Sequence, residues 1–271
     1  MTPPGPPPTA GRPLVFAHRG GADALPEHTL AAYLRALDEG ADGVECDVRL
    51  TRDGHLVCVH DRRLERTSNG TGPVSAKTLA QLEELDFGSW RGPFVEELTA
   101  EHTRLLTLER LLTALRDWGR PVRLLIETKH PSRYGGEVER RLVETLARFG
   151  LAEPVADDPL HVTVMSFAAF ALRRVRALAP ALPTVYLLEM LPPVVRKGRL
   201  PFGARIAGPG VALLRTRPAL LPTFRAAGCQ AYVWTVNDDT DLDLVLAQGA
   251  DGIISDRPRF VIDRLDNAPP V

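Results

Sequence analysis

Two acidic residues, Glu45 and Asp47, stand two positions apart in the apolar run GVECDV. Side chains two apart on a β-strand share a face, so both carboxylates point one way and Cys46 the other. Glu127, at the end of another apolar run, shares a face with Lys129 by the same rule. Inward carboxylates repel one another unless a cation neutralises them. The three acids together would give an all-oxygen site to one divalent cation, which could be Mg²⁺, Ca²⁺ or Mn²⁺. Any one of these acids taken alone is more often a surface residue paired with an arginine.

Two histidines, His18 and His60, also end apolar segments. Imidazoles at such positions could act as general base and general acid near neutral pH, although one strand-end histidine alone is more often structural. Arg19 and Lys129 would add two fixed cations beside the metal, a combination suited to a phosphate diester. Asp61 either orients a histidine or begins the turn after its strand.

Short apolar runs alternate with segments of helical periodicity, and this alternation is typical of parallel α/β architecture. In one helical segment Leu30, Tyr33, Leu34 and Leu37 follow the spacing of a buried helix face, and Gly40 stands at its end. The fold class predicted is a (β/α)₈ TIM barrel with a small insertion between strands 2 and 3. Eight strands are expected, at residues 14–17, 43–48, 122–127, 162–166, 184–188, near 206, 231–235 and 252–255.

The insertion covers about residues 61–105 and is too long for an ordinary connection between a strand and a helix. Loops after barrel strands form the catalytic face, so the insertion either covers the active site as a lid or wall or packs structurally against helices. Six prolines precede Leu14, and residues 1–13 are expected to be a flexible leader. Residues 14–271 would then form a single barrel domain.

The composition excludes several classes of protein. The formal net charge of −1 gives no general cationic field for nucleic acid. Three cysteines without a C-x-x-C pair argue against a disulfide framework or a zinc knuckle. No apolar run approaches the length of a membrane span, and no signal-peptide core is present. We therefore expect a cytoplasmic protein with a small-molecule substrate and no stable membrane insertion, and we leave the oligomeric state open.

Taken together, these motifs resemble the glycerophosphodiester phosphodiesterase family. The resemblance runs from about Val15 to Pro258 and rests on the combined spacing of H-R-G, E-x-D, H-D and E-x-K. It extends through HRGGADALPEHTLAAY, GVECDVRLTRDGHLVCVHDRRLERTSNGTG, LLTLERLL, LLIETK, VMSF and YVWTVNDDTDLDLVLAQGADGIISDRP. It implies a TIM barrel with an inserted subdomain, a divalent cation and hydrolysis of glycerophosphodiesters such as glycerophosphocholine or glycerophosphoethanolamine to glycerol 3-phosphate and an alcohol.

The resemblance also implies roles for individual residues. His18 and His60 become the acid/base pair, Arg19 and Lys129 contact phosphate, and the metal ligands are Glu45, Asp47 and Glu127. Trp234 matches an aromatic residue that lines the substrate pocket, although a core tryptophan would fit the same pattern. Glu27 matches the acid of the P-E-N-T motif and is expected to support the site, as is Asp61.

Two positions depart from the family pattern. His28 replaces the usual asparagine of P-E-N-T, which predicts a weaker helix N-cap or an altered hydrogen bond to the site. Leu106 stands where many members have proline, at the exit of the insertion. Neither change removes a catalytic group.

Two other functions use the same residues. One is a phospholipase D-like or phosphatidylinositol-specific reaction on a lipid head group, which would require an exposed apolar rim. The clustered candidates for that rim lie in the insertion, at Phe87, Trp90 and Phe94. The other is a non-catalytic phosphoester-binding barrel, against which the intact histidine pair speaks.

Overall fold

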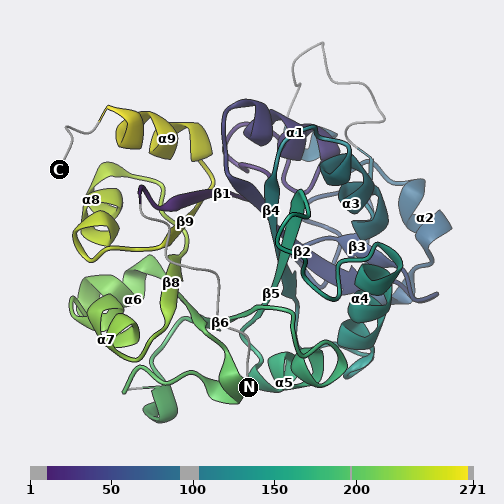
Figure 1. Cartoon of the computed structure of the whole chain (residues 1–271). Helices are drawn as coiled ribbons and strands as arrows, with labels where there is room; N and C mark the ends of the chain where they lie inside the picture. Colours follow the sequence, from purple (N-terminus) through teal and green to yellow (C-terminus); the bar gives the residue numbers. More distant parts are fainter. Residues whose placement is uncertain (1–10, 92–103, 196, 268–271) are drawn as a thin grey trace.

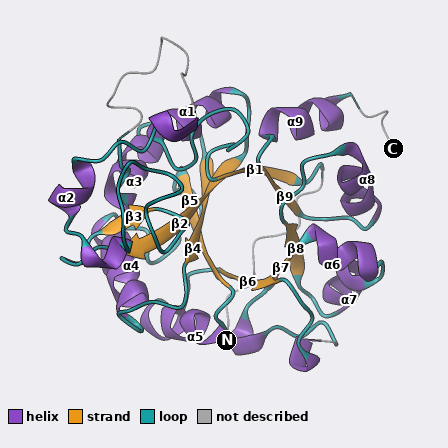
Figure 2. Cartoon of the chain, turned by 180° about the vertical axis from the view of Figure 1, so that it is seen from behind, coloured by secondary structure: helices purple, strands orange, loops and turns teal. Residues whose placement is uncertain are grey.

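Eight parallel strands close into a barrel around which helices pack, as the computed structural model shows from opposite sides in Figures 1 and 2. The structure describes residues 11–91, 104–195 and 197–267. Around the barrel the strand order is β1, β9, β8, β7, β6, β5, β4 and β2, and the pairing of β1 with β2 closes it. The barrel strands are β1 (Leu14–His18), β2 (Gly43–Leu50), β4 (Val122–Thr128), β5 (Leu160–Ser166), β6 (Thr184–Leu188), β7 (Ile206–Pro209), β8 (Gln230–Val233) and β9 (Gly252–Ser255).

The helices follow the strands and cover the outside of the barrel (Figure 1). Local signals start several of them, because the side chains of Thr29, Thr107 and Asp238 each accept a hydrogen bond from a backbone N–H of the first turn. The described residues form α1 (Leu30–Asp38), α2 (Leu79–Glu83), α3 (Leu108–Arg116), α4 (Glu137–Arg148), α5 (Ala169–Leu178), α6 (Val211–Thr216), α7 (Leu220–Ala226), α8 (Asp239–Ala247) and α9 (Pro258–Asp266).

Alternation along the strands divides the apolar residues between two environments. One set faces the helices and forms two large clusters outside the barrel. The other fills the barrel interior and comprises Phe16, Leu125, Met165, Val185, Leu187, Ile206, Tyr232 and Ile254. On β1 and β2 the inward positions change from apolar or small to ionisable toward the carboxyl end, and on β4 the inward Leu125 is followed by Glu127. The barrel is therefore a packed core with a polar layer at one end.

A short arm leaves the barrel after β2. Its strand β3 (Leu56–Cys58) runs antiparallel to β2, and the chain continues into the insertion through η1 (Val74–Ala76), α2 and η2 (Ser89–Arg91). The arm and the insertion bury a cluster of their own, made of Val57, Val59, Leu64, Val74, Leu82, Phe87 and Leu105.

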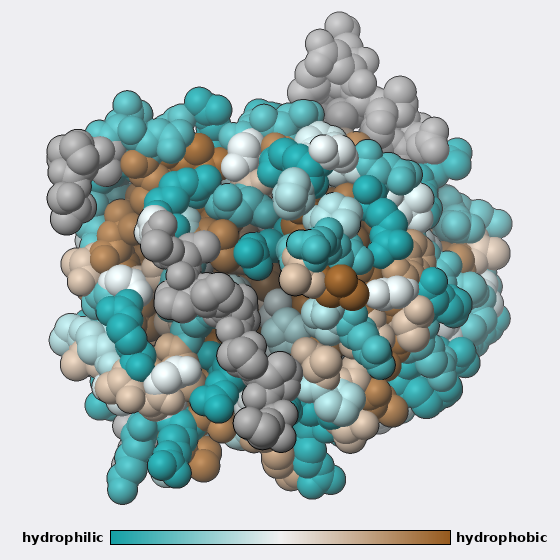
Figure 3. All heavy atoms as spheres, in the orientation of Figure 1, coloured by the Kyte–Doolittle hydropathy of each residue, from teal (hydrophilic) through white to brown (hydrophobic). Residues whose placement is uncertain are grey.

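The eight predicted barrel strands are confirmed, with shifted ends. Strand β2 continues two residues beyond Val48 because the arm pairs with that extension. Strand β8 ends at Val233, so Trp234 lies just beyond it. The space-filling view in Figure 3 shows hydrophilic residues over much of the face, with hydrophobic ones between them. None of the described helices is long and apolar enough to cross a membrane. The predicted leader falls largely on residues 1–10, outside the described part of the chain.

Candidate active site

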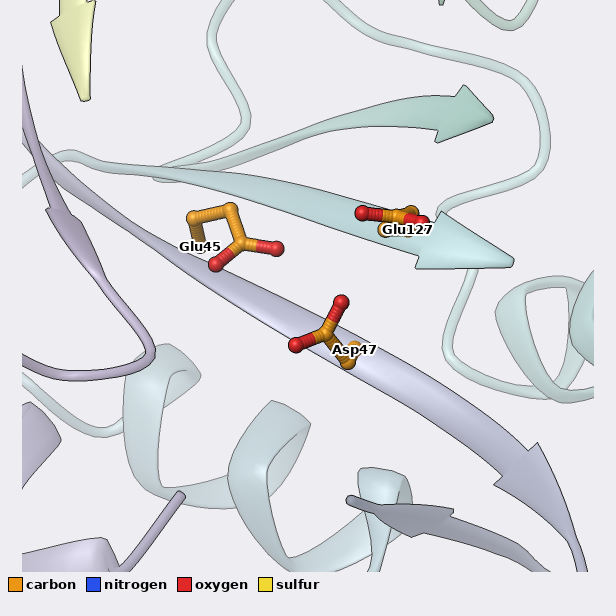
Figure 4. A group of neighbouring side chains, drawn as sticks. All are labelled: Glu45, Asp47 and Glu127. Atoms are coloured by element: carbon orange, nitrogen blue, oxygen red, sulfur yellow. The ribbon is translucent and has the colours of Figure 1, made fainter. Parts of the chain in front are cut away.

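Strand register brings the three predicted metal-ligating acids together. Asp47 of β2 pairs in register with Glu127 of β4, and Glu45 lies two positions earlier on the same face of β2. One carboxylate oxygen from each residue lies within 4.8 Å of the others. Figure 4 shows the side chains turned toward one another from the two strands. All three are buried, so little water reaches their charges.

Two cations flank the acids. Lys129 places its Nζ 2.8 Å from Glu127 Oε1 and 3.3 Å from Asp47 Oδ1. Arg19 places its Nε 3.2 Å from Asp47 Oδ2, and its backbone N–H donates to Glu45 Oε2 at 3.1 Å. The turn that holds Arg19 depends on Gly20, whose φ of +89° favours glycine. A Cβ added at Gly20 would lie only 2.8 Å from Ala32 Cβ, so no side chain fits there.

The acids differ in protonation because their partners differ. Burial, then the charges of Asp47 and Glu127, raise the pKa of Glu45 well above its usual range. Burial and the Asp47 charge raise the pKa of Glu127 to about 8. Burial also acts against ionised Asp47, but the hydrogen bond from His28 and the charge of Lys129 hold its pKa well below the ordinary value. The neighbouring cations therefore do not neutralise Glu45 and Glu127 as they do Asp47. A cluster of carboxylate oxygens with this deficit of positive charge fits a hard divalent cation.

His18 is held by residues from the far end of the chain. Its Nδ1 hydrogen bonds with Asp256 Oδ1 at 2.6 Å, and its Nε2 lies 4.0 Å from Glu45 Oε2. Asn237 in turn donates from Nδ2 to Asp256 Oδ2 at 2.7 Å and accepts from the backbone N–H of Asp256. The imidazole is therefore fixed in one orientation, with Nε2 toward the acids. Sequence reasoning missed Asp256 and Asn237, although both lie at strand ends within the motifs that it singled out.

His60 is held by its neighbours in sequence. Its Nδ1 hydrogen bonds with Asp61 Oδ1 at 2.7 Å, as predicted for an orienting residue. Arg66 contacts Asp61 Oδ2 at 2.5 Å and also pairs with both carboxylate oxygens of Glu27. Glu27 accepts a further hydrogen bond from Arg19. The predicted supporting residues Glu27 and Asp61 thus lie in one ion-pair network, which Arg66, unpredicted, completes.

Burial and two neighbouring cations keep the His60 ring neutral. Burial, with smaller contributions from the charges of Arg19 and Lys129, lowers the pKa of His60 to about 4 against the opposing charge of Asp47. Its ring is therefore neutral at neutral pH. Since Nδ1 faces the ionised Asp61, the proton resides on Nδ1 and Nε2 is unprotonated.

The departure at His28 alters a hydrogen bond and leaves the helix cap intact. Thr29, not residue 28, is the N-cap of α1, so the expected weakening of the cap is wrong. His28 is buried at φ +61° and bridges Tyr33 Oη (2.7 Å from Nδ1) and Asp47 Oδ2 (3.0 Å from Nε2). His28 therefore contacts one of the three clustered carboxylates directly. Leu106, the other departure, is buried in a core cluster.

These groups open into a cavity of about 540 Å³ at the carboxyl ends of the strands. His18, Arg19, Glu45, His60, Glu127 and Lys129 line one part of it. The opposite wall is apolar and includes Met165, Phe167, Leu187, Trp234 and Ile254, with Glu189 at its edge. Trp234 donates its indole N–H to Gly208 O, and Phe167 packs edge-to-face on its ring at 5.3 Å. Trp234 therefore lines the cavity, as the resemblance implied.

The insertion does not line this cavity in its described part. Trp90 donates its indole N–H to the backbone oxygen of Phe87 and is about two-thirds buried. Phe87 is buried in the cluster of the arm, so it cannot form an exposed rim for lipid. Phe94 lies outside the described residues. Within its described residues the insertion therefore packs on its own cluster and does not form a wall of the cavity.

Comparisons with known proteins agree on one family. A sequence model described as the glycerophosphoryl diester phosphodiesterase family matches residues 18–260. A Mycobacterium tuberculosis protein named "Probable glycerophosphodiester phosphodiesterase 1" is 49% identical over 92% of this chain and 91% of its own. A Caldanaerobacter subterraneus glycerophosphodiester phosphodiesterase is 32% identical over 92% and 96% of the two chains. An Oleispira antarctica phosphodiesterase structure, in complex with the product sn-glycerol 3-phosphate, superposes with a TM-score of 0.80 at 27% identity, covering 94% and 97%.

Proposed function

This chain belongs to the glycerophosphoryl diester phosphodiesterase family, and on that premise we propose how it works: metal-dependent hydrolysis of glycerophosphocholine or glycerophosphoethanolamine by His18 and His60. The products are glycerol 3-phosphate and the free alcohol. The observation that carries the proposal is that both histidines, two cations and the carboxylate cluster line one cavity. A phosphate diester placed there meets every group that its hydrolysis requires.

Arg19 and Lys129 bind the phosphate. Their side chains are mostly buried, so their charges are weakly screened where an anion enters. Because Asp47 already contacts both, a substrate phosphate shares these cations with a carboxylate, and their hold on it strengthens as negative charge grows on the phosphate oxygens.

Glu45, Asp47 and Glu127 would hold the divalent cation. When bound, the cation supplies positive charge that polarises the phosphate and neutralises the repulsion among the three carboxylates. His28 and Lys129 keep Asp47 ionised and oriented for this role.

His60 is the better candidate for the general base. It is neutral at neutral pH, and Asp61 leaves its Nε2 free to accept a proton from the nucleophile. His18 is then the general acid, since Asp256 holds its ring through Nδ1 and Nε2 faces the cavity, from which it donates a proton to the leaving alkoxide. The nucleophile is water or the 2-hydroxyl of the glycerol, the latter passing through a cyclic phosphate.

The apolar wall binds the alcohol half. Trp234 offers an aromatic face, Phe167 packs against the Trp234 ring and has Lys129 over its own, and Glu189 adds a carboxylate to the lining of the same cavity. An aromatic face with a nearby acid suits a quaternary or primary ammonium group, which choline and ethanolamine carry. A neutral alcohol such as glycerol or inositol would gain less from this wall.

The test is release of the free alcohol from a panel of diesters: glycerophosphocholine, glycerophosphoethanolamine, glycerophosphoinositol and a lysophosphatidylcholine. Glycerol 3-phosphate is measured as the second product of the three soluble diesters, and lysophosphatidic acid as that of the lysolipid. We expect the two ammonium substrates to be hydrolysed fastest, chelation to abolish activity, and Mg²⁺, Mn²⁺ or Ca²⁺ to restore it. Full activity after exhaustive chelation, with bound metal measured as zero, would remove the cation from the mechanism. A preference for the lysolipid would favour the phospholipase D-like alternative.

A further inference from the structure

Exposed large apolar side chains gather in one part of the molecule. Among the described residues, six of the eight such side chains lie between residues 167 and 202. Met190 is 73% exposed, Val194 70% and Phe170 61%. The same segment also turns Leu191, Val195 and Leu200 inward onto the core, so it is packed on one side and apolar on the other. An ordered segment that exposes apolar side chains in this way marks an interaction surface.

Two of these side chains meet where helix α5 contacts the turn η4 (Pro201–Gly203). Phe170 and Phe202 pack with ring centroids 5.7 Å apart, and the Arg173 guanidinium covers both rings. Met190 and Val194 lie in the loop after β6, the strand that pairs with β5, and Val194 belongs to the short helix η3 (Pro193–Val195) of that loop. We call Phe170, Met190, Val194, Phe202, Arg173, Lys197 and Arg199 the apolar-basic rim.

The rim is strongly positive in a chain whose net charge is −1. Residues 166–205 contain one acidic residue, Glu189, and seven basic residues: Arg173, Arg174, Arg176, Arg196, Lys197, Arg199 and Arg205. Of these, Arg174 pairs with Glu139, and Arg196 lies outside the described residues. Arg173, Lys197, Arg199 and Arg205 are exposed. Positive charge beside exposed methionine, valine and phenylalanine is the composition of a surface that binds anionic lipid.

The rim is continuous with the mouth of the catalytic cavity. Phe167 lines the cavity, and Phe170 lies one helical turn further along the chain. Glu189 also lines the cavity, and Met190 follows it directly. The end of the rim at Phe170 and Met190 therefore adjoins the cavity mouth, whereas Lys197 and Arg199 flank Gly198, which lies against the end of α7.

We propose that the apolar-basic rim docks the enzyme reversibly on a bilayer surface containing anionic phospholipid. Met190, Val194 and Phe170 enter the region between head groups and acyl chains, while Lys197, Arg199 and Arg173 contact lipid phosphates. The charge of the segment favours this partner, because a second copy of the chain would bring two positive surfaces together. The proposal stands independently of the alcohol that the active site prefers, since none of the rim residues lines the cavity.

The experiment is co-sedimentation of the purified protein with vesicles of phosphatidylcholine alone or of phosphatidylcholine with phosphatidylglycerol. We expect binding to the anionic vesicles, weakened by salt, and little binding to the neutral ones. K197E/R199E should lower the partition coefficient on anionic vesicles by about 30-fold or more. M190S/V194S should lower it by about tenfold or more at constant charge.

Matched controls separate the rim from general charge and general apolarity. R52E/R217E makes the same change in net charge at exposed positions outside the rim, and V155S removes an exposed apolar side chain elsewhere. Both controls should bind like the wild type, and all variants should keep the thermal midpoint and the activity on glycerophosphocholine. Absence of vesicle binding, equal binding to neutral vesicles, or equal loss in R52E/R217E would overturn the proposal. So would a concentration-dependent dimer, seen by sedimentation velocity, that M190S/V194S dissolves without changing vesicle binding.

Discussion

The two sides of the cavity mouth hold their histidines by different means. His18 is anchored by Asp256, which is 238 residues away in sequence and is itself held by Asn237. His60 is anchored by Asp61, the next residue, on an arm outside the barrel. Both pairs have nearly the same length, 2.6 and 2.7 Å between nitrogen and oxygen, but only the first joins the first and last strands of the barrel.

His18 is therefore held more rigidly than His60, whose supporting residues are more exposed. The His18 imidazole is 17% exposed and His60 31%, and the network behind His60 passes through Arg66, which is 43% exposed, before it reaches the buried Glu27. Exposed ion pairs contribute little to stability and are screened by salt. The barrel side should therefore tolerate change poorly in both folding and rate, whereas changes on the arm side should alter rate or protonation with a smaller structural cost.

The largest effect is expected from removing either imidazole. H18A and H60A should each lower kcat on glycerophosphocholine by about 10²-fold or more, the usual loss for a general acid or base. The double variant should be little slower than either single one. Steady-state assays with saturating metal measure this, and near-native turnover of either variant would make that histidine structural.

The orienting carboxylates should separate the two sides. D256N should lower kcat by about 10- to 100-fold, because it weakens the hydrogen bond that orients His18, whereas D61N should lower it by about tenfold or less. Asn is nearly isosteric with Asp, so both variants should fold. Equal losses in the two variants, with equal thermal midpoints, would contradict the comparison.

The tryptophans should separate specificity from stability. W234A should change the ratio of kcat/KM between glycerophosphocholine and glycerophosphoinositol by roughly 1–2 kcal/mol, since it removes an aromatic wall from the cavity. W90A should lower the thermal midpoint and leave that ratio unchanged, because Trp90 packs in the insertion. A changed ratio in W90A would restore the insertion as a wall of the site.

The smallest expected effect is a pH dependence of stability. The pKa of His60 is about 4 in the folded protein, compared with 6.5 as the ordinary value, so the unfolded chain binds more protons between these limits. The neutral His60 ring therefore makes its full contribution to the free energy of unfolding above pH 6.5, and this contribution is lost as the pH falls toward 4. H60Q should reduce this loss by about 1–2 kcal/mol after allowance for partial exposure, as measured by urea unfolding across the range. An unchanged slope would mean that His60 titrates normally.

The alternation of residues along single strands was enough to predict the cluster of acids on the neighbouring strands β2 and β4. Glu45, Asp47 and Glu127 follow from the period of two along apolar strands, and register then sets their approach. Asp61 follows His60 directly, so its role needed no tertiary information. Asp256 and Asn237 could not be assigned to His18 in this way, because their contact exists only once β9 closes against β1.

The errors have the same origin. Phe87 was a candidate for an exposed rim, yet a small core of the arm buries it, while Trp90 is partly exposed and donates its indole N–H to the Phe87 backbone oxygen. The exposed apolar residues lie instead around Met190 and Phe170, in segments whose spacing alone does not distinguish surface from core. Whether an apolar residue is covered depends on neighbours that the linear sequence does not specify.

The most direct measurement of the central claim compares leaving groups. A glycerophosphodiester of p-nitrophenol needs no proton on its leaving oxygen, whereas choline does. If His18 is the acid and His60 the base, H18A should lose about 10²-fold or more on glycerophosphocholine but recover most of that loss on the p-nitrophenyl diester. H60A should be impaired equally on both. Recovery in H60A and none in H18A would reverse the two roles, and recovery in neither would contradict acid catalysis by this pair.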